Sequence, residues 1–292
     1  MMPYNLTPEQ LALYGVARFT WHRRGVAKHR GLSFGEESVT ETILMDLAET
    51  FPGPLRILQF SKAEEGKNGA DWAWLFQSAD GSQNLPMLVQ AKALDQKDLA
   101  YPEIKRVIGK LKPPIRQIDR LITTAKSWKW PAIYAFYNHL DDTTRIPDVC
   151  KSLPASSTFG LIAESWGVSI ADAEAVRNLL NDQSFDSHRH HSRPLHCLLC
   201  SGGKGVRPAG GSPELARRFI ADLRAGPDGV EAASSWRSDP DLELREEPPG
   251  VFREAMSILD EDDRGDREAR VEALAQEFPG LAGVVVLRDA KT

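Results

Sequence analysis

Cysteine is scarce in this chain, and both long apolar runs and a targeting segment are missing. Three cysteines in 292 residues, Cys150, Cys197 and Cys200, argue against a disulfide framework and for a reducing compartment. No stretch approaches the roughly 18 consecutive apolar residues of a membrane span. The first ten residues also lack the basic start and apolar core of a secretory signal. We therefore expect a cytosolic protein with no membrane partner.

The chain as a whole lacks a strong excess of charge, with a net charge of −5, but its charges are unevenly distributed. Residues 1–150 carry 19 Lys and Arg against 17 Asp and Glu, whereas the remainder carries 17 against 24. Between residues 92 and 129, ten basic residues stand against four acidic ones. This local excess of positive charge favours an anionic partner. A solvated, lysine-rich helix surface is the alternative explanation.

The composition, 41% hydrophobic and 26% charged, is that of a globular protein and excludes disorder over the whole length. Helical spacing of apolar residues predicts helices over about 36–50, 115–125, 170–180, 213–225 and 266–278. Ser33 and Glu36 form a capping-box pattern at the start of the first of these helices. Apolar runs between turn residues predict strands, the first three forming a meander, at 55–60, 72–76, 87–94, 131–137, 159–163 and 284–287.

These elements predict an α/β fold in which helices flank a mixed sheet. We expect residues 1–165 to form one domain and residues 166–292 to form an accessory region. The accessory region is strongly acidic between residues 228 and 270, where 14 acidic residues stand against six basic ones, and we expect loose structure there. The last helix and strand either return to cover the core or make a small subdomain.

Polar residues interrupt the predicted strands at three points. Gln90 and Lys92 are two residues apart, so they share one face of a strand, while the apolar residues between them point to the other face. Asp71 opens the preceding strand, and a hairpin would bring its carboxylate near Gln90. Glu37 and Glu41 are spaced i, i+4 on the predicted first helix. We expect both to face the sheet, with Glu37 closer to Asp71.

Together these side chains form a candidate site for Mg²⁺ or Mn²⁺. The oxygen ligands would come from Asp71, Gln90 and Glu37, and hard oxygen ligands with several retained waters suit magnesium. One such water is a nucleophile for phosphodiester hydrolysis, and Lys92 would orient it and neutralise charge that develops on the phosphate. The alternative is a set of ion pairs that join the helix to the sheet, with Gln90 merely hydrogen-bonded.

The ordered set, helix Glu37, then Gly69-Ala70-Asp71, then Gln90-Ala91-Lys92, resembles the PD-(D/E)xK restriction-endonuclease-like superfamily. It is similar to the Mrr-like variant, in which Gln replaces the acidic residue. Residues 36–137 also look like an uncharacterised bacterial domain family with this signature, through the blocks GEESVTE, KAEEGKNGADWAW, VQAK and AFYN. The resemblance implies a restriction-endonuclease-like fold and Mg²⁺-dependent cleavage of DNA, by analogy in defence against foreign DNA. It implies that Asp71, Gln90, Lys92 and Glu37 are catalytic.

Residues around this set have further expected roles. On the helix after the Gln-x-Lys strand, Arg116, Gln117, Arg120 and Lys126 are candidates for nucleic-acid binding, because similar nucleases use that helix. Surface side chains without such a role are the alternative. Glu64 and Glu65 are either outer metal ligands, substrate contacts or solvated loop charges.

A structural Zn²⁺ at Cys197 and Cys200, with two nearby histidines, is a further alternative. The missing second CxxC pair argues against it.

Two classes of function follow. The first is a metal-dependent endonuclease that hydrolyses DNA. The second is a catalytically inactive module that keeps the nuclease fold and binds nucleic acid or protein, with the acidic second half docking a partner. Convergence of Asp71, Gln90 and Lys92 in space favours the enzyme. The sequence leaves homo-oligomer formation open.

Overall fold

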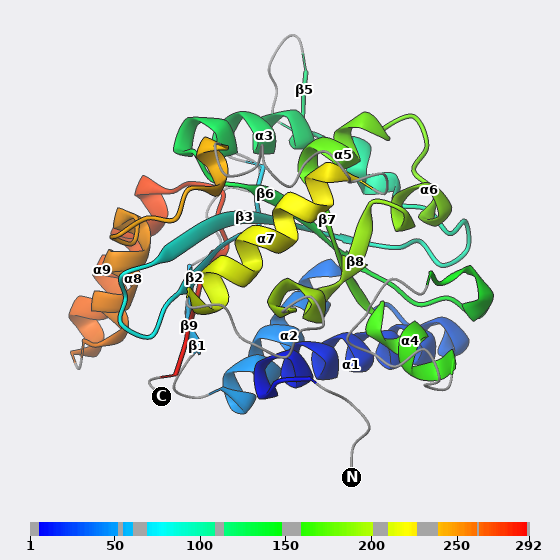
Figure 1. Cartoon of the computed structure of the whole chain (residues 1–292), viewed down its shortest axis with the longest axis horizontal. Coiled ribbons are helices and arrows are strands. Elements are labelled where there is room, and N and C mark those ends of the chain that lie inside the picture. Colours follow the sequence, from blue (N-terminus) through cyan, green and yellow to red (C-terminus); the bar gives the residue numbers. More distant parts are fainter. Residues whose placement is uncertain are drawn as a thin grey trace.

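The structure, a computed structural model, describes residues 6–51, 55–60, 69–108, 114–147, 159–200, 210–226, 239–261 and 263–290. At its centre is a seven-stranded mixed sheet with the order β1-β9-β2-β3-β6-β7-β8 (Figure 1). The pairs β2·β9 and β3·β6 are parallel, and the other neighbours are antiparallel. The strands are β1 (Leu55–Gln59), β2 (Trp72–Gln77), β3 (Asn84–Ala93), β6 (Ala132–Tyr137), β7 (Val168–Asp172), β8 (Ser192–Pro194) and β9 (Gly283–Arg288).

Helices cover both faces of this sheet (Figure 1). One apolar cluster joins the sheet to α1, α2 and α7, and a second joins its other face to α3, α5, α8 and α9. The predicted fold class, a mixed sheet flanked by helices, is therefore confirmed. The helices are α1 (Pro8–Arg30), α2 (Glu36–Thr50), α3 (Gln117–Trp128), α4 (Phe159–Ser165), α5 (Ala173–Asn178), α6 (Phe185–Arg189), α7 (Gly211–Ala225), α8 (Gly250–Leu259) and α9 (Arg264–Glu277).

Strand β3 carries the alternation that the sequence predicts. Val89 and Ala91 belong to the cluster with α1 and α2, whereas Leu88 belongs to the cluster with α3. Gln90 and Lys92 therefore point toward the α3 side, and each is only 1% exposed. A strand in the middle of a sheet that is covered on both faces is buried throughout, so these two polar side chains need partners inside the protein.

Helix α2 begins and ends as predicted, but its cap does not match the prediction. The N-cap is Gly35, which makes no side-chain cap hydrogen bond, so the capping box between Ser33 and Glu36 is wrong. A capping box does occur at α1, where Thr7 and Gln10 bond to each other's backbone. The side chain of Glu36 is thereby available for a contact outside its own helix.

The predicted meander is wrong, because β9 lies between β1 and β2. It pairs antiparallel with β1 and parallel with β2, so Val285 is opposite both Ile57 and Trp74. The run Gly283–Arg288 is apolar on both faces, as expected for a strand buried in the middle of a sheet. Local sequence pattern identifies such a strand but does not tell which strands are its neighbours.

Two short apolar segments have the opposite structure from the one predicted. Residues 159–163, predicted as a strand, belong to helix α4. The predicted helix over 170–180 begins as strand β7, and only α5 is helical, because the Asp172 side chain caps it by accepting from the backbone N–H groups of Glu174 and Ala175. Apolar runs of this length do not distinguish a buried strand from a buried helix.

Residues 166–292 contribute β7, β8 and β9 to the same sheet as the first half of the chain. A boundary at residue 165 would cut the sheet between β6 and β7. Of the two alternatives for the last strand, the structure has the return to the core. Helix α8, within the acidic segment, buries Val251, Phe252, Ala255 and Ile258 against the sheet. In the described part of the chain, no helix is long and apolar enough for a membrane span.

Candidate functional site

Asp71 and Gln90 meet where β2 begins. The backbone N–H of Asp71 donates to the Val89 carbonyl at 2.9 Å and so extends the β2·β3 ladder by one residue. The Asp71 Oδ2 atom accepts from Gln90 Nε2 at 2.6 Å and from the Ala91 backbone N–H at 2.8 Å. The hairpin therefore brings the carboxylate beside Gln90, as the sequence predicts.

Gly69 allows this approach. Its φ is +82°, a left-handed conformation that favours glycine. A Cβ at residue 69 would lie 2.6 Å from both the Gln117 carbonyl and the Leu121 backbone nitrogen. The chain before Asp71 therefore packs directly on the first turns of α3, which brings Asp71 and the start of that helix together.

Gln117, the first residue of α3, belongs to the same polar group. Its Nε2 donates to Gln90 Oε1 at 2.8 Å, and the residue is 6% exposed. The prediction that Gln117 binds nucleic acid at the surface is not met, because its side chain is buried against β3. The sequence does indicate this burial, because Gln117, Leu121 and Ala125 are spaced i, i+4 and i+8 and so share one face of the helix. The buried face of α3 thus begins with a polar residue.

Lys92 pairs with Glu36 rather than with Glu37. The Lys92 Nζ lies 3.4 Å from Glu36 Oε2, and the other Glu36 oxygen accepts from the Ala93 backbone N–H at 3.0 Å. Glu36 is spaced i+3 and i+7 from the buried residues Val39 and Ile43, which places it on the packed side of α2. The sequence pattern assigned Glu36 to a capping box with Ser33, so its position on the packed side of the helix was missed.

The expectation that Glu37 and Glu41 face the sheet is wrong. Both side chains are exposed, although both border the same cavity as Asp71 and Lys92. The reason is helical geometry, because the stripe that packs on the sheet runs through residues 36, 39, 40 and 43. Thr40 on that stripe bonds to the Tyr137 hydroxyl of β6 at 2.7 Å.

One cavity of about 320 Å³ is lined by all five of these polar side chains, Asp71, Gln90, Gln117, Lys92 and Glu36. Its walls come from the start of α2, the ends of β1 and β2, strand β3, the segment before α3 and the turn before β9. The segment before α3 includes η1 (Pro102–Lys105) and a small two-stranded ribbon, β4 (Val107–Ile108) and β5 (Ile115–Arg116). Arg106 and Val107 line the cavity from this segment, and both are exposed. The lining therefore carries more acidic than basic side chains, with Lys92 buried inside and Arg106 at the exposed border.

Burial dominates the electrostatics of Asp71. Removal from water raises the pKa of its carboxyl to about 6, against the pull of the Lys92 charge and of the hydrogen bonds from Ala91 and Gln90. The nearby Glu36 charge raises the pKa further. A buried carboxyl with a raised pKa beside a buried lysine in a cavity is typical of functional sites. A cation bound beside Asp71 would lower the pKa of this carboxyl and so oppose the effect of burial.

Arg24 of α1 is a further buried charge that sequence reasoning missed. Its guanidinium donates to the Phe34 carbonyl at 3.0 Å and also bonds to the Leu94 carbonyl. Phe34 lies just before α2 and Leu94 just after β3. Arg24 thus joins the helix that carries Glu36 to the strand that carries Lys92.

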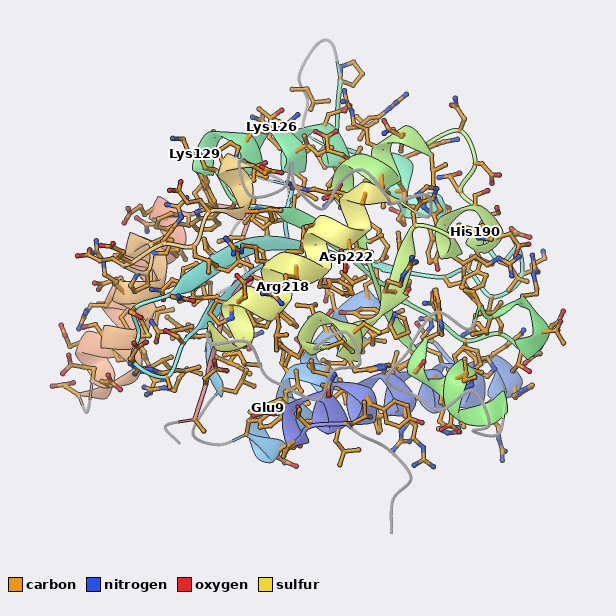
Figure 2. All side chains as sticks on the ribbon, viewed as in Figure 1. Glu9, Lys126, Lys129, His190, Arg218 and Asp222 are labelled. Carbon is orange, nitrogen blue, oxygen red and sulfur yellow. The ribbon has the colours of Figure 1, made fainter. Side chains whose placement is uncertain are left out.

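The predicted nucleic-acid-binding residues do not form one surface. Arg116 is exposed, Arg120 is half-buried and Lys126 is exposed at the far end of α3, where Figure 2 shows it beside Lys129. Lys126 is paired with Glu174 of α5 at 2.6 Å.

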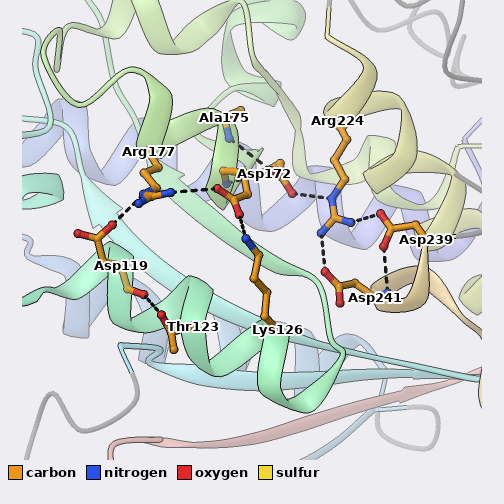
Figure 3. Close-up of polar contacts among 10 residues, drawn as sticks. Asp119, Thr123, Lys126, Asp172, Ala175, Arg177, Arg224, Asp239 and Asp241 are labelled. Carbon is orange, nitrogen blue, oxygen red and sulfur yellow. Dashed lines mark hydrogen bonds and ion pairs between the residues drawn. The ribbon is translucent and has the colours of Figure 1, made fainter. Parts of the chain in front are cut away.

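Lys126 lies in a network of charges that joins α3, α5 and α7 (Figure 3). Arg177 bonds to Asp119 at 2.8 Å, and Arg224 bonds to the buried Asp172 at 3.0 Å and to Asp239 at 2.5 Å. The carboxylate of Glu174 therefore offsets the charge of Lys126, within a network that holds both acidic and basic side chains.

Near the cysteine pair, His196 Nε2 lies 3.8 Å from Cys197 Sγ, but the described residues there form no group of three ligands. Cys197 is buried in the 3₁₀ helix η3 (Leu195–Leu199), and Cys200 accepts from Gln10 Nε2 at 3.1 Å. Neither belongs to a described group of three His, Cys, Asp or Glu side chains with ligand spacing. Residues 64, 65 and 150, which the sequence analysis also considered, lie outside the described residues.

Comparison with known proteins gives a family but no function. No curated protein and no solved structure matches the chain. Residues 10–292 match the family described as "Family of unknown function (DUF6615)". The match includes α1, the cavity and the last strand, and thus nearly the whole chain. The chain therefore belongs to the DUF6615 family.

Proposed function

We propose that this protein is a metal-dependent nuclease of the PD-(D/E)xK type, with Gln90 in place of the acidic residue, that hydrolyses phosphodiester bonds of DNA. The observation that carries the proposal is the convergence of Asp71, Gln90, Lys92 and Glu36 on one cavity. The order of these residues along the chain, helix, strand, strand, is that of the superfamily which the sequence resembles. A role in defence against foreign DNA is part of this proposal by analogy only.

The donor set of the cavity fits a hard divalent cation. Carboxylate oxygens of Asp71 and Glu36 and the amide oxygen of Gln90 are the ligand types that Mg²⁺ and Mn²⁺ prefer. Glu37, at the exposed border, adds a further carboxylate. When bound, the cation supplies charge neutralisation and an acidified water.

The remaining roles, ligand binding, positioning and charge stabilisation, would fall to side chains of the protein. Asp71, fixed by two hydrogen bonds on one oxygen, keeps its other oxygen for a ligand. Gln117 donates to the amide oxygen of Gln90, and the Gln90 nitrogen faces Asp71, so Gln90 must turn its amide to place that oxygen on a cation beside Asp71. Lys92, oriented by Glu36, presents its ammonium group to the attacking water or to the phosphate oxygens that gain charge in the transition state.

The charge distribution favours a polyanionic substrate such as DNA. The excess of positive charge between residues 92 and 129 includes Arg106 at the border of the cavity and Arg116 on the adjacent ribbon. Contacts from these residues to phosphates would hold a strand over the cavity without reading its sequence.

The test is cleavage of supercoiled plasmid DNA by the purified chain with Mg²⁺ or Mn²⁺. We expect nicked or linear product with the metal, none in EDTA and none from Asp71→Ala. Asp98→Ala, an exposed aspartate after β3, is the matched control and should cleave like the wild type. Equal cleavage by Asp71→Ala and wild type would refute the proposed site.

A specific observation favours the second candidate, a nuclease-fold module that binds without cleaving. Gln90 Oε1 already accepts from Gln117, and Lys92 already pairs with Glu36, so both polar groups have protein partners. The same plasmid experiment separates the two functions. A wild-type chain that binds DNA but leaves it intact with either metal would support the module.

A further inference from the structure

A second group of metal-ligating side chains lies outside the cavity. His29 is in the last turn of α1, and His139 and Asp141 follow strand β6. One ligand atom from each residue lies within 4.8 Å of the other two. None of the three lines the cavity that holds Asp71 and Lys92. The proposed nuclease function makes no use of them.

The distances between these atoms suit ligands of a single ion. His139 Nε2 lies 3.2 Å and His29 Nε2 lies 3.6 Å from the same oxygen, Asp141 Oδ1. A tetrahedral Zn²⁺ with ligand bonds of about 2.0–2.2 Å requires ligand atoms roughly 3.3–3.5 Å apart. Both nitrogen–oxygen separations are therefore close to the one that zinc would impose.

The fold holds His139 in this position. A Cβ on Gly25 of α1 would lie 2.5 Å from the His139 ring, so the missing side chain makes the space that the imidazole occupies. The Trp21 ring, one turn earlier in α1, also packs against the imidazole, with centroids 4.9 Å apart. His139 is 12% exposed at its side chain, whereas His29 and Asp141 are 68% and 52% exposed. One ligand is thus fixed by packing, and the other two leave a side open to water.

Lys28 of α1 fixes the orientation of the Asp141 carboxylate. Lys28 binds the other oxygen, Oδ2, at 2.7 Å, and so leaves Oδ1 to the histidines.

We infer that His29, His139 and Asp141 form a three-ligand site for a divalent transition-metal ion such as Zn²⁺, with water as the fourth ligand. Two imidazoles and one carboxylate select such an ion over Mg²⁺. The ion would fasten the end of α1 to the segment after β6. Arg24, one helical turn earlier in α1, bonds to the end of β3, so the site braces the helix that holds β3 in place.

The test measures Zn²⁺ binding by the full chain in competition with a chromogenic chelator. Variants His29→Gln and Asp141→Asn change exposed side chains and should keep the fold, which circular dichroism checks. We expect each to lose one equivalent of zinc, or to bind it at least about tenfold more weakly. Zinc should also raise the melting temperature of the wild type but not of either variant, because it binds the folded state.

Three control variants locate the bound ion. His22→Gln removes another α1 histidine that bonds to a carboxylate, Glu164, and should bind zinc like the wild type. The double variant Cys197→Ser/Cys200→Ser and the Asp71→Asn variant should also retain this equivalent. The inference is overturned if His29→Gln and Asp141→Asn bind zinc as tightly as the wild type. The same outcome would leave the nuclease proposal untouched, because its residues are not changed.

Discussion

Asp71 is a buried carboxylate whose neighbours do not fully offset the cost of its charge. Its pKa is raised to about 6 in the folded chain, above the ordinary value of 3.8. The folded state therefore binds the proton more tightly than the unfolded state. Ionised Asp71 costs stability above pH 6, and this cost fades as the pH falls from 6 toward 4. Retaining such a carboxylate makes sense where a cation is to be bound.

The first prediction concerns this cost. In metal-free protein, Asp71→Asn should increase the free energy of unfolding at pH 7.5, by at most about 3 kcal/mol, since one pKa unit corresponds to about 1.4 kcal/mol. The gain should shrink toward zero near pH 4. Urea unfolding at both pH values measures it, and the exposed Asp98→Asn is the control. A gain that is the same at both pH values would mean that the carboxylate is not destabilised by burial.

Glu36 and Glu37 are adjacent, but the structure gives them different surroundings. Glu36 bonds to Lys92 and to the Ala93 backbone, whereas Glu37 is exposed. We therefore expect Glu36→Gln to lower the rate of Mg²⁺-dependent DNA cleavage at least about tenfold more than Glu37→Gln. Initial rates of plasmid nicking at equal protein concentration provide the comparison. A greater loss of cleavage rate in Glu37→Gln would mean that Glu37, as expected from the sequence, is the functional carboxylate of the helix.

At the scale of elements, sequence pattern predicts those whose apolar spacing is regular. The stripes of α2, α3, α7 and α9 and the buried strands β1, β2, β3 and β6 appear where the pattern places them, within a few residues. Short apolar runs fail, as at α4 and β7, because burial on all sides removes the periodicity that distinguishes helix from strand. The same holds for the site residues, of which only those in a regular pattern could be predicted. Alternation predicted Gln90 and Lys92, whereas Gln117 and Glu36 required knowing which helix face packs on the sheet.

Helix α3 and the ribbon beside it carry the predicted DNA contacts unequally. Arg116 and Arg106 lie near the cavity, whereas Lys126 is paired with Glu174 in the acidic network of Figure 3. We expect Arg116→Ala or Arg106→Ala to weaken DNA binding and Lys126→Ala to have little effect. Each lost phosphate contact should flatten the log–log dependence of affinity on salt by about 0.9 on duplex DNA.

Fluorescence anisotropy with a short duplex, over a series of salt concentrations, measures these slopes. Lys97→Ala, an exposed lysine outside both regions, serves as the control. If Lys126→Ala flattens the slope as much as Arg116→Ala does, DNA lies along the whole of α3. If none of the variants changes the slope, the basic segment is a solvated surface without a binding role.

The whole molecule is organised by contacts between distant parts of the chain. The last strand, β9, fills the position between β1 and β2, more than 200 residues earlier in sequence. Its two neighbours in the sheet, β1 and β2, border the cavity, and so does the turn that leads into β9. Local sequence pattern cannot predict that β9 inserts between β1 and β2, because the residues of a strand do not specify which strands pair with it. The acidic second half is therefore part of the framework around the site.

The central claim is that this framework presents Lys92 to a phosphodiester in a metal-dependent site. Its most direct test is the rate of plasmid nicking with Mg²⁺ by Lys92→Ala beside Lys97→Ala, two lysines from the same segment, of which one is buried in the site and one is exposed. Circular dichroism and melting temperature confirm folding, and Lys92→Met replaces the alanine variant if folding is lost. We predict a loss of roughly 100-fold or more for Lys92 and wild-type rates for Lys97. Equal rates for the two folded variants would contradict the account.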